Sequence, residues 1–270
     1  MLKRNLCSVF RSSSKATTFV CFICTLFCCL PENMTCSQYK VILFDSYGTL
    51  IDVDDLLENT QNVISSTDLK LPTELINLWR AKQLDYTWLR SLMKNPMADS
   101  YQDFWVVTRD ALKFSLAKLN ISSTQSQLDN LMNGWLHLRL FPDVKESLTV
   151  LKKNYQLAIL SNGTPHMLRE VSKSNGLGDF ISPANEISVD DVKVFKPHPS
   201  VYALAESKLR VSKSEILFVS GNSWDVIGAK TYGFESIWIN RKNVPEDQLN
   251  TMADMQFPDL IQLTKRFGSS

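Results

Sequence analysis

Short apolar runs alternate with helical patterns along most of the chain, and polar residues follow each run. Branched and aromatic residues dominate residues 40–44, 157–160, 215–219 and 236–239. Runs of this length without apolar–polar alternation are typical of strands that are buried on both faces of a parallel sheet. Helical patterns lie between them, as at 202–209 and 226–232. This alternation predicts an α/β fold with a doubly wound, parallel, Rossmann-like sheet.

A long helical pattern interrupts the alternation after the first run. Between about residues 50 and 134, apolar residues recur at helical spacing with charged residues between them, as around Leu75, Leu78 and Trp79. No good strand pattern occurs there. We therefore expect three parts: an N-terminal extension over residues 1–38, a Rossmann-like core over 39–53 and 135–270, and an inserted all-helical cap over 54–134.

Composition and charge limit the types of molecule that the protein is expected to bind. The formal net charge is +1, and acidic and basic residues are interspersed, so the chain lacks the basic patch that attracts nucleic acids. All six cysteines precede Tyr39, and Cys21 and Cys24 form a C-x-x-C without a second pair of ligands. The three histidines lie far apart. We therefore expect a small-molecule partner, no nucleic-acid partner and no site of the zinc type.

Polar residues gather where the predicted strands end. These residues are Asp45, Ser161, Asn162, Ser220, Asn222 and Asp225. In open α/β sheets, ligands bind beyond the carboxyl ends of the strands. The sequence therefore predicts a functional site at this edge of the sheet.

All six residues fall within three of four short motifs. The four motifs are Phe44–Leu50 (FDSYGTL), Leu160–Gly163 (LSNG), Lys196–Pro197, and Ser220–Asp225 (SGNSWD). In their order and spacing they resemble the haloacid dehalogenase superfamily. With the stretch Leu78–Arg90 (LWRAKQLDYTWLR), they are most similar to the L-2-haloacid dehalogenases, also called type II or (S)-2-haloacid dehalogenases. The resemblance covers about residues 39–267.

The resemblance implies a hydrolytic dehalogenase whose nucleophile is Asp45. Its carboxylate would displace halide from C2 of a short (S)-2-haloacid, and water would open the resulting ester to give an (R)-2-hydroxyacid. Lys196 matches the lysine beside the nucleophile, where a cation favours the charged carboxylate. Thr49 matches the residue that orients this carboxylate. Arg80 matches the cap residue that reaches toward the departing halide.

The remaining matches concern the hydrolytic water and the substrate. Asp225 matches a residue near the attacking water, Ser220 and Asn222 match residues that hold that region, and Tyr202 matches a supporting position. The substrate-binding set implied by the resemblance is Ser46, Tyr47, Arg80, Ser161 and Asn162. Taken singly, each residue also fits a structural role, such as a helix cap for Asp225 or a solvated surface charge for Arg80.

The resemblance also implies that the reaction needs no metal ion or other cofactor. Phosphatases of the superfamily carry a second acid two residues after the nucleophile and another in the last motif, where this chain has Tyr47 and Asn222. Halide leaves without a proton, and an amide is a weaker magnesium ligand than a carboxylate. A metal-dependent phosphatase of the same superfamily and a non-catalytic relative are the alternatives.

Two further points follow from the resemblance. Relatives of this type are commonly homodimers, so a homodimer is the implied oligomer. Gly221 stands where several relatives have a small hydroxyl residue. Its loss could loosen the hydrogen bonds around Asn222 and Asp225 or change the preferred substrate.

The N-terminal segment allows three interpretations. Residues 1–16 carry basic but no acidic residues, and the apolar stretch 17–30 is shorter than the roughly 20 residues of a membrane span. It fits a signal peptide, a short membrane anchor, or an extension upstream of a true start at Met34. A glycosylation sequon at Asn162 lies inside the predicted site, which favours a cytoplasmic body. If the segment is used, the protein is secretory or anchored.

Overall fold

A six-stranded parallel sheet forms the centre of the part of the chain that the computed structural model describes, residues 38–64, 70–93 and 101–268. The strands are β1 (Val41–Phe44), β2 (Gln156–Ser161), β3 (Glu186–Ser188), β4 (Ile216–Ser220), β5 (Glu235–Ile239) and β6 (Met255–Phe257). Their order is β3-β2-β1-β4-β5-β6, and all neighbours are parallel. The predicted doubly wound α/β fold is confirmed. The strand order reverses beside β1, which is where such sheets bind ligands.

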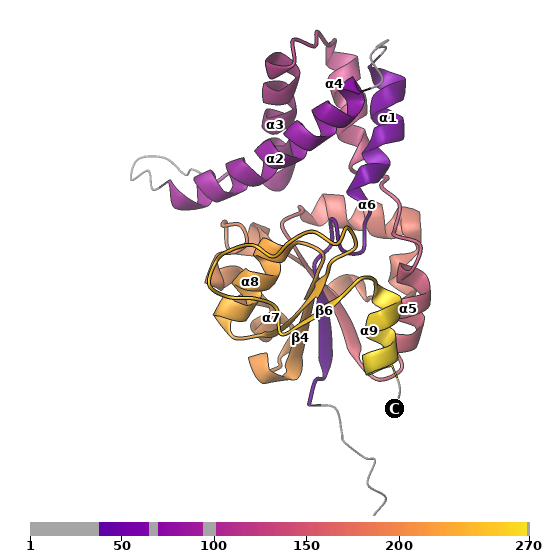
Figure 1. The fold of residues 1–270 in the computed structure, drawn as a ribbon, viewed down its shortest axis with the longest axis vertical. Helices are drawn as coiled ribbons and strands as arrows, with labels where there is room; N and C mark the ends of the chain where they lie inside the picture. Colours follow the sequence, from indigo (N-terminus) through magenta and orange to yellow (C-terminus); the bar gives the residue numbers. More distant parts are fainter. Residues whose placement is uncertain (1–37, 65–69, 94–100, 269–270) are drawn as a thin grey trace, which may run out of the picture. The chain divides into compact units, whose positions relative to one another are not determined.

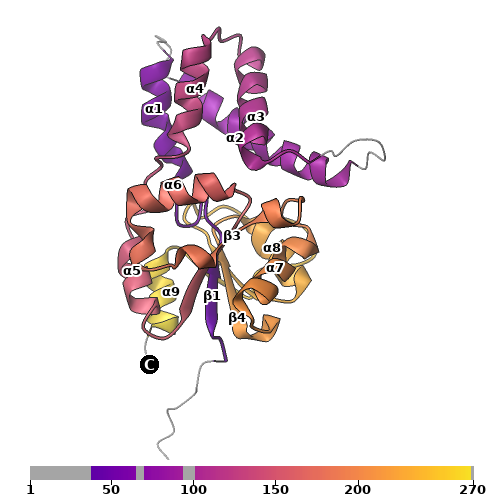
Figure 2. The same ribbon diagram turned by 180° about the vertical axis from the view of Figure 1, so that it is seen from behind.

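Helices cover both faces of this sheet. In chain order the helices of the described residues are α1 (Leu56–Val63), α2 (Leu71–Leu92), α3 (Phe104–Lys118), α4 (Gln125–Gly134), α5 (Val144–Leu151), α6 (Pro165–Asn175), α7 (Pro199–Leu209), α8 (Ser223–Tyr232) and α9 (Leu260–Phe267), of which α5 to α9 flank the sheet. Short 3₁₀ turns lie at Val53–Asp55, Leu177–Asp179, Pro183–Asn185, Val189–Asp191 and Lys213–Glu215. In Figures 1 and 2, α7 and α8 lie on one side of the sheet and α5 and α9 on the other.

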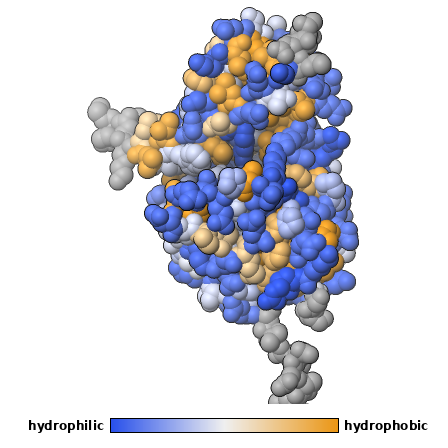
Figure 3. Space-filling view, viewed as in Figure 1, coloured by the Kyte–Doolittle hydropathy of each residue, from blue (hydrophilic) through white to orange (hydrophobic). Residues whose placement is uncertain are grey.

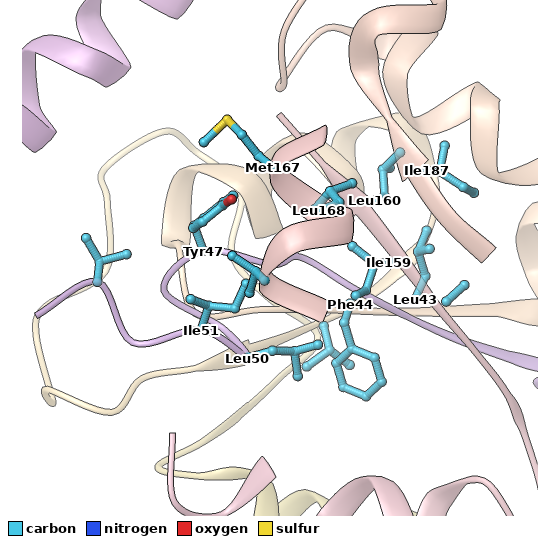
Figure 4. Packing of buried hydrophobic residues seen from close by; sticks show 14 of the residues in the cluster. Leu43, Phe44, Tyr47, Leu50, Ile51, Ile159, Leu160, Met167, Leu168 and Ile187 are labelled. Carbon is cyan, nitrogen blue, oxygen red and sulfur yellow. The ribbon is translucent and has the colours of Figure 1, made fainter. Parts of the chain in front are cut away.

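Apolar residues explain why β1 and β4 form the middle of the sheet. Every residue of both strands is fully buried, because helices cover the two faces and neighbouring strands cover both edges. Figure 4 shows Leu43 and Phe44 of β1 beside Ile159 and Leu160 of β2, with Met167 and Leu168 of α6 packed nearby. This core holds the loop after β1 in place.

The chain between β1 and α5 forms a group of helices, α1 to α4, and its described residues contain no strand. Local signals start two of them: Asp103 caps α3 by accepting from the Val106 amide, and Thr124 forms a capping box with Gln127 at the start of α4. The predicted all-helical insertion is thus present. Its expected boundaries at residues 54 and 134 stay a prediction.

The surface is mostly polar in the view of Figure 3, with apolar residues where α2 ends. Leu89, Leu92 and Met93 at this end are half or more exposed. Within the described residues, no helix is both long enough and apolar enough to cross a bilayer. The cysteines and the apolar stretch 17–30 lie outside the described residues.

Candidate active site

The loops after three adjacent strands meet at one edge of the sheet. Phe44, the last residue of β1, pairs in register with Ile159 of β2 and Val219 of β4. The backbone N–H of Asp45 donates to the Val219 carbonyl oxygen at 2.9 Å. Because the three strands are parallel and in register, the residues that follow them lie together. The predicted site at the strand ends is therefore assembled by the sheet.

Asp45 lies at the centre of this edge and receives three side-chain hydrogen bonds. The Thr49 hydroxyl and the Asn222 amide each donate to its Oδ2 at 2.8 Å, and Lys196 Nζ donates to Oδ1 at 3.0 Å. The residue is only 6% exposed. Three donors, one of them a cation, fix the orientation of this carboxylate. The remaining directions around its oxygens are available to a reacting carbon.

Lys196 is fully buried between two carboxylates. Its Nζ lies 3.0 Å from Asp45 Oδ1 and 2.9 Å from Asp225 Oδ2. Burial opposes the charge on the ammonium, but the Asp225 and Asp45 carboxylates outweigh it and raise the pKa of Lys196. The backbone N–H of Lys196 donates to Asn162 Oδ1 at 3.0 Å, so the lysine is tied to the end of β2. It is a fixed, permanent cation.

Asp225 lies behind Lys196 and has no exposed surface. Its Oδ2 accepts from Lys196, and its Oδ1 accepts from the Tyr202 hydroxyl at 2.8 Å. Burial raises the pKa of Asp225 to about 6, against the opposing effect of Lys196. Burial also raises the pKa of Tyr202 well above its usual value, so the phenol donates as a neutral hydroxyl. Asp225 is thus a carboxylate whose charge changes near neutral pH.

A small cavity opens in front of Asp45. Its lining residues are Asp45, Tyr47, Arg80, Leu84, Phe104, Ser161, Asn162, Asn222 and Trp224. Six of the predicted site residues line it, while Thr49, Lys196, Tyr202, Ser220 and Asp225 lie behind and support them. Ser46 is buried next to Asp45 but is not among the lining residues.

Tyr47 supplies an unpaired hydroxyl to this cavity. The side chain is buried, and its hydroxyl has no hydrogen-bond partner among the described residues. Burial raises the pKa of Tyr47, so the group remains a neutral donor. The Ser46 hydroxyl is likewise buried without a partner in the described part of the chain. A buried polar group without a partner is costly, so Tyr47 is suited to bind a polar atom of a ligand.

Arg80 brings a second cation to the cavity from α2. Burial lowers the pKa of Arg80, and the charge on Asp45 opposes that shift. Its guanidinium carbon lies 6.0 Å from the centre of the Trp135 ring, and its Nη1 donates to Gln83 Oε1 at 2.5 Å. A guanidinium keeps its proton in proteins. The cavity is therefore lined by a permanent cation from α2.

Asn222 faces the nucleophile through its amide nitrogen. Nδ2 lies 2.8 Å from Asp45 Oδ2 and 3.0 Å from the Tyr47 carbonyl oxygen, and two acceptors at these distances require a donor. The Asn222 side chain therefore bonds to Asp45, while its backbone carbonyl accepts from the Asp225 N–H at 3.1 Å and its own N–H donates to the Ser220 hydroxyl at 3.1 Å. Within the described residues, no group of three His, Cys, Asp or Glu side chains is placed to hold a metal ion.

Gly221 has no room for a side chain. Its N–H donates to the Thr49 hydroxyl at 2.7 Å, and its carbonyl accepts from Trp238 Nε1 at 3.2 Å. A Cβ at this position would lie 2.2 Å from the Gly48 carbonyl oxygen, well inside van der Waals contact. The turn after β1 thus approaches the end of β4 more closely than a serine here would allow.

Three residues of the site were not singled out as functional from the sequence. Leu84 and Phe104 form apolar walls of the cavity, and Trp224 lines it as well. Trp224 also packs edge-on against Trp88 of α2, with ring centres 5.6 Å apart. The position of Leu84 was available from the sequence, because a residue four after Arg80 lies on the same helix face.

Comparisons with known proteins agree with this geometry. The sequence model of the protein family of haloacid dehalogenase-like hydrolases matches residues 39–233 of this chain. The chain is 39% identical over 235 residues to a (S)-2-haloacid dehalogenase of Pseudomonas sp. (strain YL), covering 86% of this chain and 95% of the relative. It is 42% identical over 198 residues to that of Xanthobacter autotrophicus, covering 72% of each.

One solved structure is especially informative. The L-2-haloacid dehalogenase of Xanthobacter autotrophicus with chloropropionic acid covalently bound is similar to this chain, with a TM-score of 0.74 and 34% identity. The match covers 84% of this chain and 97% of that one. The covalently bound chloropropionic acid was observed in the Xanthobacter autotrophicus protein.

Proposed function

Because the chain belongs to the haloacid dehalogenase-like hydrolases, we propose that it converts short (S)-2-haloacids to (R)-2-hydroxyacids. The observation that carries this proposal is the environment of Asp45. Its carboxylate is held by Thr49, Asn222 and Lys196 and faces a small cavity lined by apolar residues and by Arg80. A relative that shares the fold holds chloropropionic acid covalently, as attack by a side chain requires.

The first step is a displacement at C2 of the substrate. An oxygen of Asp45 forms a bond to C2 as the carbon–halogen bond breaks, and the electron pair leaves with the halide. Attack from the side opposite the halide inverts the configuration. Lys196 offsets the repulsion between the carboxylates of enzyme and substrate, and the Arg80 guanidinium stabilises the charge that develops on the halogen.

The substrate carboxylate needs donors that are free in the resting site. The Tyr47 hydroxyl, which has no partner among the described residues, is one. Ser161 and Asn162 line the same cavity from the end of β2. We assign these three residues to substrate binding, with Leu84, Phe104 and Trp224 around the alkyl part. Ser46 stays a predicted binding residue without a lining position.

The second step is hydrolysis of the aspartyl ester. Water adds to the carbonyl carbon of Asp45 as one of its protons passes to a nearby base. The bond between this carbon and the ester oxygen then breaks, and the ester oxygen leaves on C2 and takes a proton from the base to become the hydroxyl of the 2-hydroxyacid. The second proton of the water is released when Asp45 returns to its carboxylate form. Asp225 is our candidate base, because its pKa of about 6 suits proton transfer near neutral pH. One of its oxygens accepts a hydrogen bond from Lys196 and the other from Tyr202. We therefore propose that the proton reaches Asp225 through these hydrogen-bonded residues.

The donor set favours this reaction over phosphate transfer. The position two residues after Asp45 holds Tyr47, which burial keeps neutral, and Asn222 turns an N–H toward the nucleophile. Neither supplies the carboxylate that a magnesium site prefers. We therefore propose a reaction without a metal ion. The homodimer implied by the resemblance and a membrane role for residues 17–30 stay predictions.

Halide release tests the function directly. Purified protein, treated with a chelator, is expected to release chloride from (S)-2-chloropropanoate and not from the R enantiomer, and Asp45→Asn is expected to be inactive. In a single turnover in H₂¹⁸O, mass spectrometry of the peptide containing Asp45 is expected to find the label in the carboxylate. Label that appears only in product, or full activity of Asp45→Asn, would refute the covalent mechanism.

A further inference from the structure

Arg80 is held by a chain of hydrogen bonds that runs from α2 to α3, partly buried at Arg80 and fully buried beyond it. Its Nη1 donates to Gln83 Oε1 at 2.5 Å, and Gln83 Nε2 donates to the Thr108 hydroxyl at 2.6 Å. The Thr108 hydroxyl in turn donates to the Phe104 carbonyl oxygen at 2.6 Å. Gln83 and Thr108 have no exposed surface. Thr108 lies outside the motifs that carry the resemblance, and Gln83 lies within the stretch Leu78–Arg90 but has no role assigned by it.

The chemistry of each group fixes the direction of this chain. A guanidinium has donors only, so Gln83 must turn its oxygen to Arg80 and its NH₂ group to Thr108. The single proton of the Thr108 hydroxyl goes to the Phe104 carbonyl, so the hydroxyl accepts from Gln83 through a lone pair. Reversing any link would place two donors or two acceptors against each other. The arrangement therefore has one stable orientation.

The consequence is a fixed position for the guanidinium at the cavity. The charge on Asp45, the proposed nucleophile, acts on Arg80. If the arginine were free to turn, its cation would be drawn toward the attacking carboxylate. Pairing there would weaken the nucleophile and leave the halogen without a cation. Gln83 offers a neutral acceptor that holds Arg80 without adding a competing charge.

We propose that Gln83 and Thr108 are positioning residues that hold Arg80 where the halide departs. This inference rests on the proposed dehalogenase function. It assigns the two residues to the first chemical step, because the halide leaves in ester formation and takes no part in ester hydrolysis. Their effect should therefore depend on the leaving group, which a general loss of packing would not produce.

Variants of both residues test the proposal by single-turnover halide release, with the chloro and the bromo forms of (S)-2-halopropanoate as substrates. Gln83→Leu is expected to lower the rate for the chloro substrate by about 100-fold, the scale of a misplaced catalytic group. The poorer leaving group needs the cation more. The bromo substrate should therefore lose only about tenfold, while KM changes less than kcat.

Thr108 provides the matched set of variants. Thr108→Val keeps the shape but removes the acceptor for Gln83, and we expect about a tenfold loss on the chloro substrate. Thr108→Ser keeps the hydroxyl and should restore most of the activity. Ser115 is the control, because it is also buried in α3 and donates to a carbonyl one turn back, that of Ala111, but receives no bond from Gln83. Ser115→Ala should leave both rates unchanged.

The outcomes separate this inference from the function on which it rests. If the wild-type protein releases no halide, the proposed function fails. If the wild type is active, and Thr108→Val or a folded Gln83→Leu either keeps full activity or loses the chloro and bromo reactions equally, the positioning role is wrong. Thermal unfolding of each variant identifies any that does not fold. If Gln83→Leu does not fold, the result for Thr108→Val decides whether the positioning role is correct, because this substitution changes the side-chain volume least.

Discussion

Replacing Lys196 by methionine should destabilise the protein strongly, because the ammonium separates two buried carboxylates. Its distances to Asp45 and Asp225 are 3.0 and 2.9 Å. At an effective dielectric constant of about 20, charges at such a distance attract by about 5 to 6 kcal/mol. The cost of burying the ammonium offsets part of this. Loss of one partner from a buried ion pair costs about 3 to 5 kcal/mol in measured cases.

The expected loss is therefore about 3 to 5 kcal/mol in the free energy of unfolding, or about 6 to 20 °C in the melting temperature of a body of this size. Urea unfolding at pH 8 measures it. Lys208→Met is the control, because Lys208 pairs with Asp191 at 2.8 Å with both side chains about half exposed. An exposed pair of this kind contributes about 1 kcal/mol or less.

Two further measurements test the cause. Adding Asp225→Asn to Lys196→Met removes one of the facing carboxylates and should recover at least half of the lost stability. Because the pKa of Asp225 is raised on folding, the native chain takes up a proton that the unfolded chain does not, which favours the native state as pH falls. Loss of the cation raises this pKa further, so the deficit should narrow from pH 8 to pH 5. A deficit that persists unchanged in the double variant and at pH 5 would refute the electrostatic explanation.

Three other predictions follow from the site. Activity should fall as pH drops through about 6, where Asp225 gains a proton, and this limb of the kcat profile should be absent from the residual activity of Asp225→Asn. Gly221→Ala should lower kcat at least tenfold, because the added Cβ would lie 2.2 Å from the Gly48 carbonyl oxygen. The control, Gly178→Ala, should have no effect, because nothing lies within 4 Å of its added Cβ. Equal activities of the two variants would contradict the close approach at Gly221. Thr49→Val removes the 2.8 Å bond to the nucleophile and should cost about 1.5 to 3 kcal/mol in kcat/KM, the range for a bond to a charged group, while Thr49→Ser should retain most activity.

The sequence predicted the central strands more accurately than the edges of the sheet. The apolar runs at 40–44 and 215–219 agree with β1 (Val41–Phe44) and β4 (Ile216–Ser220) within one residue, because full burial requires an unbroken apolar run. The edge strands β3 and β6 have three residues each and are partly exposed. Such segments carry little pattern, and neither was predicted.

The residues of the catalytic set were also predictable, because motifs at strand ends are local features of the sequence. Asp45, Asn162 and Asn222 each follow a strand, and parallel strands bring these ends together. The resemblance placed Lys196 beside Asp45, and the structure puts its ammonium 3.0 Å away. Strand patterning thus predicts the three strand-end residues, whereas the place of Lys196 came from the resemblance.

The tertiary structure alone decided which of these residues line the cavity and which lie behind it. Asp225 has a motif position as prominent as that of Tyr47, and the resemblance also singled out Tyr202, yet both are buried behind Lys196, while Leu84 and Phe104 line the cavity. Burial, pKa and the direction of a hydrogen bond depend on neighbours from distant segments, here α2, α3 and α8. A local sequence pattern specifies which face of an element is apolar, but contact between those faces is established only when the whole chain folds.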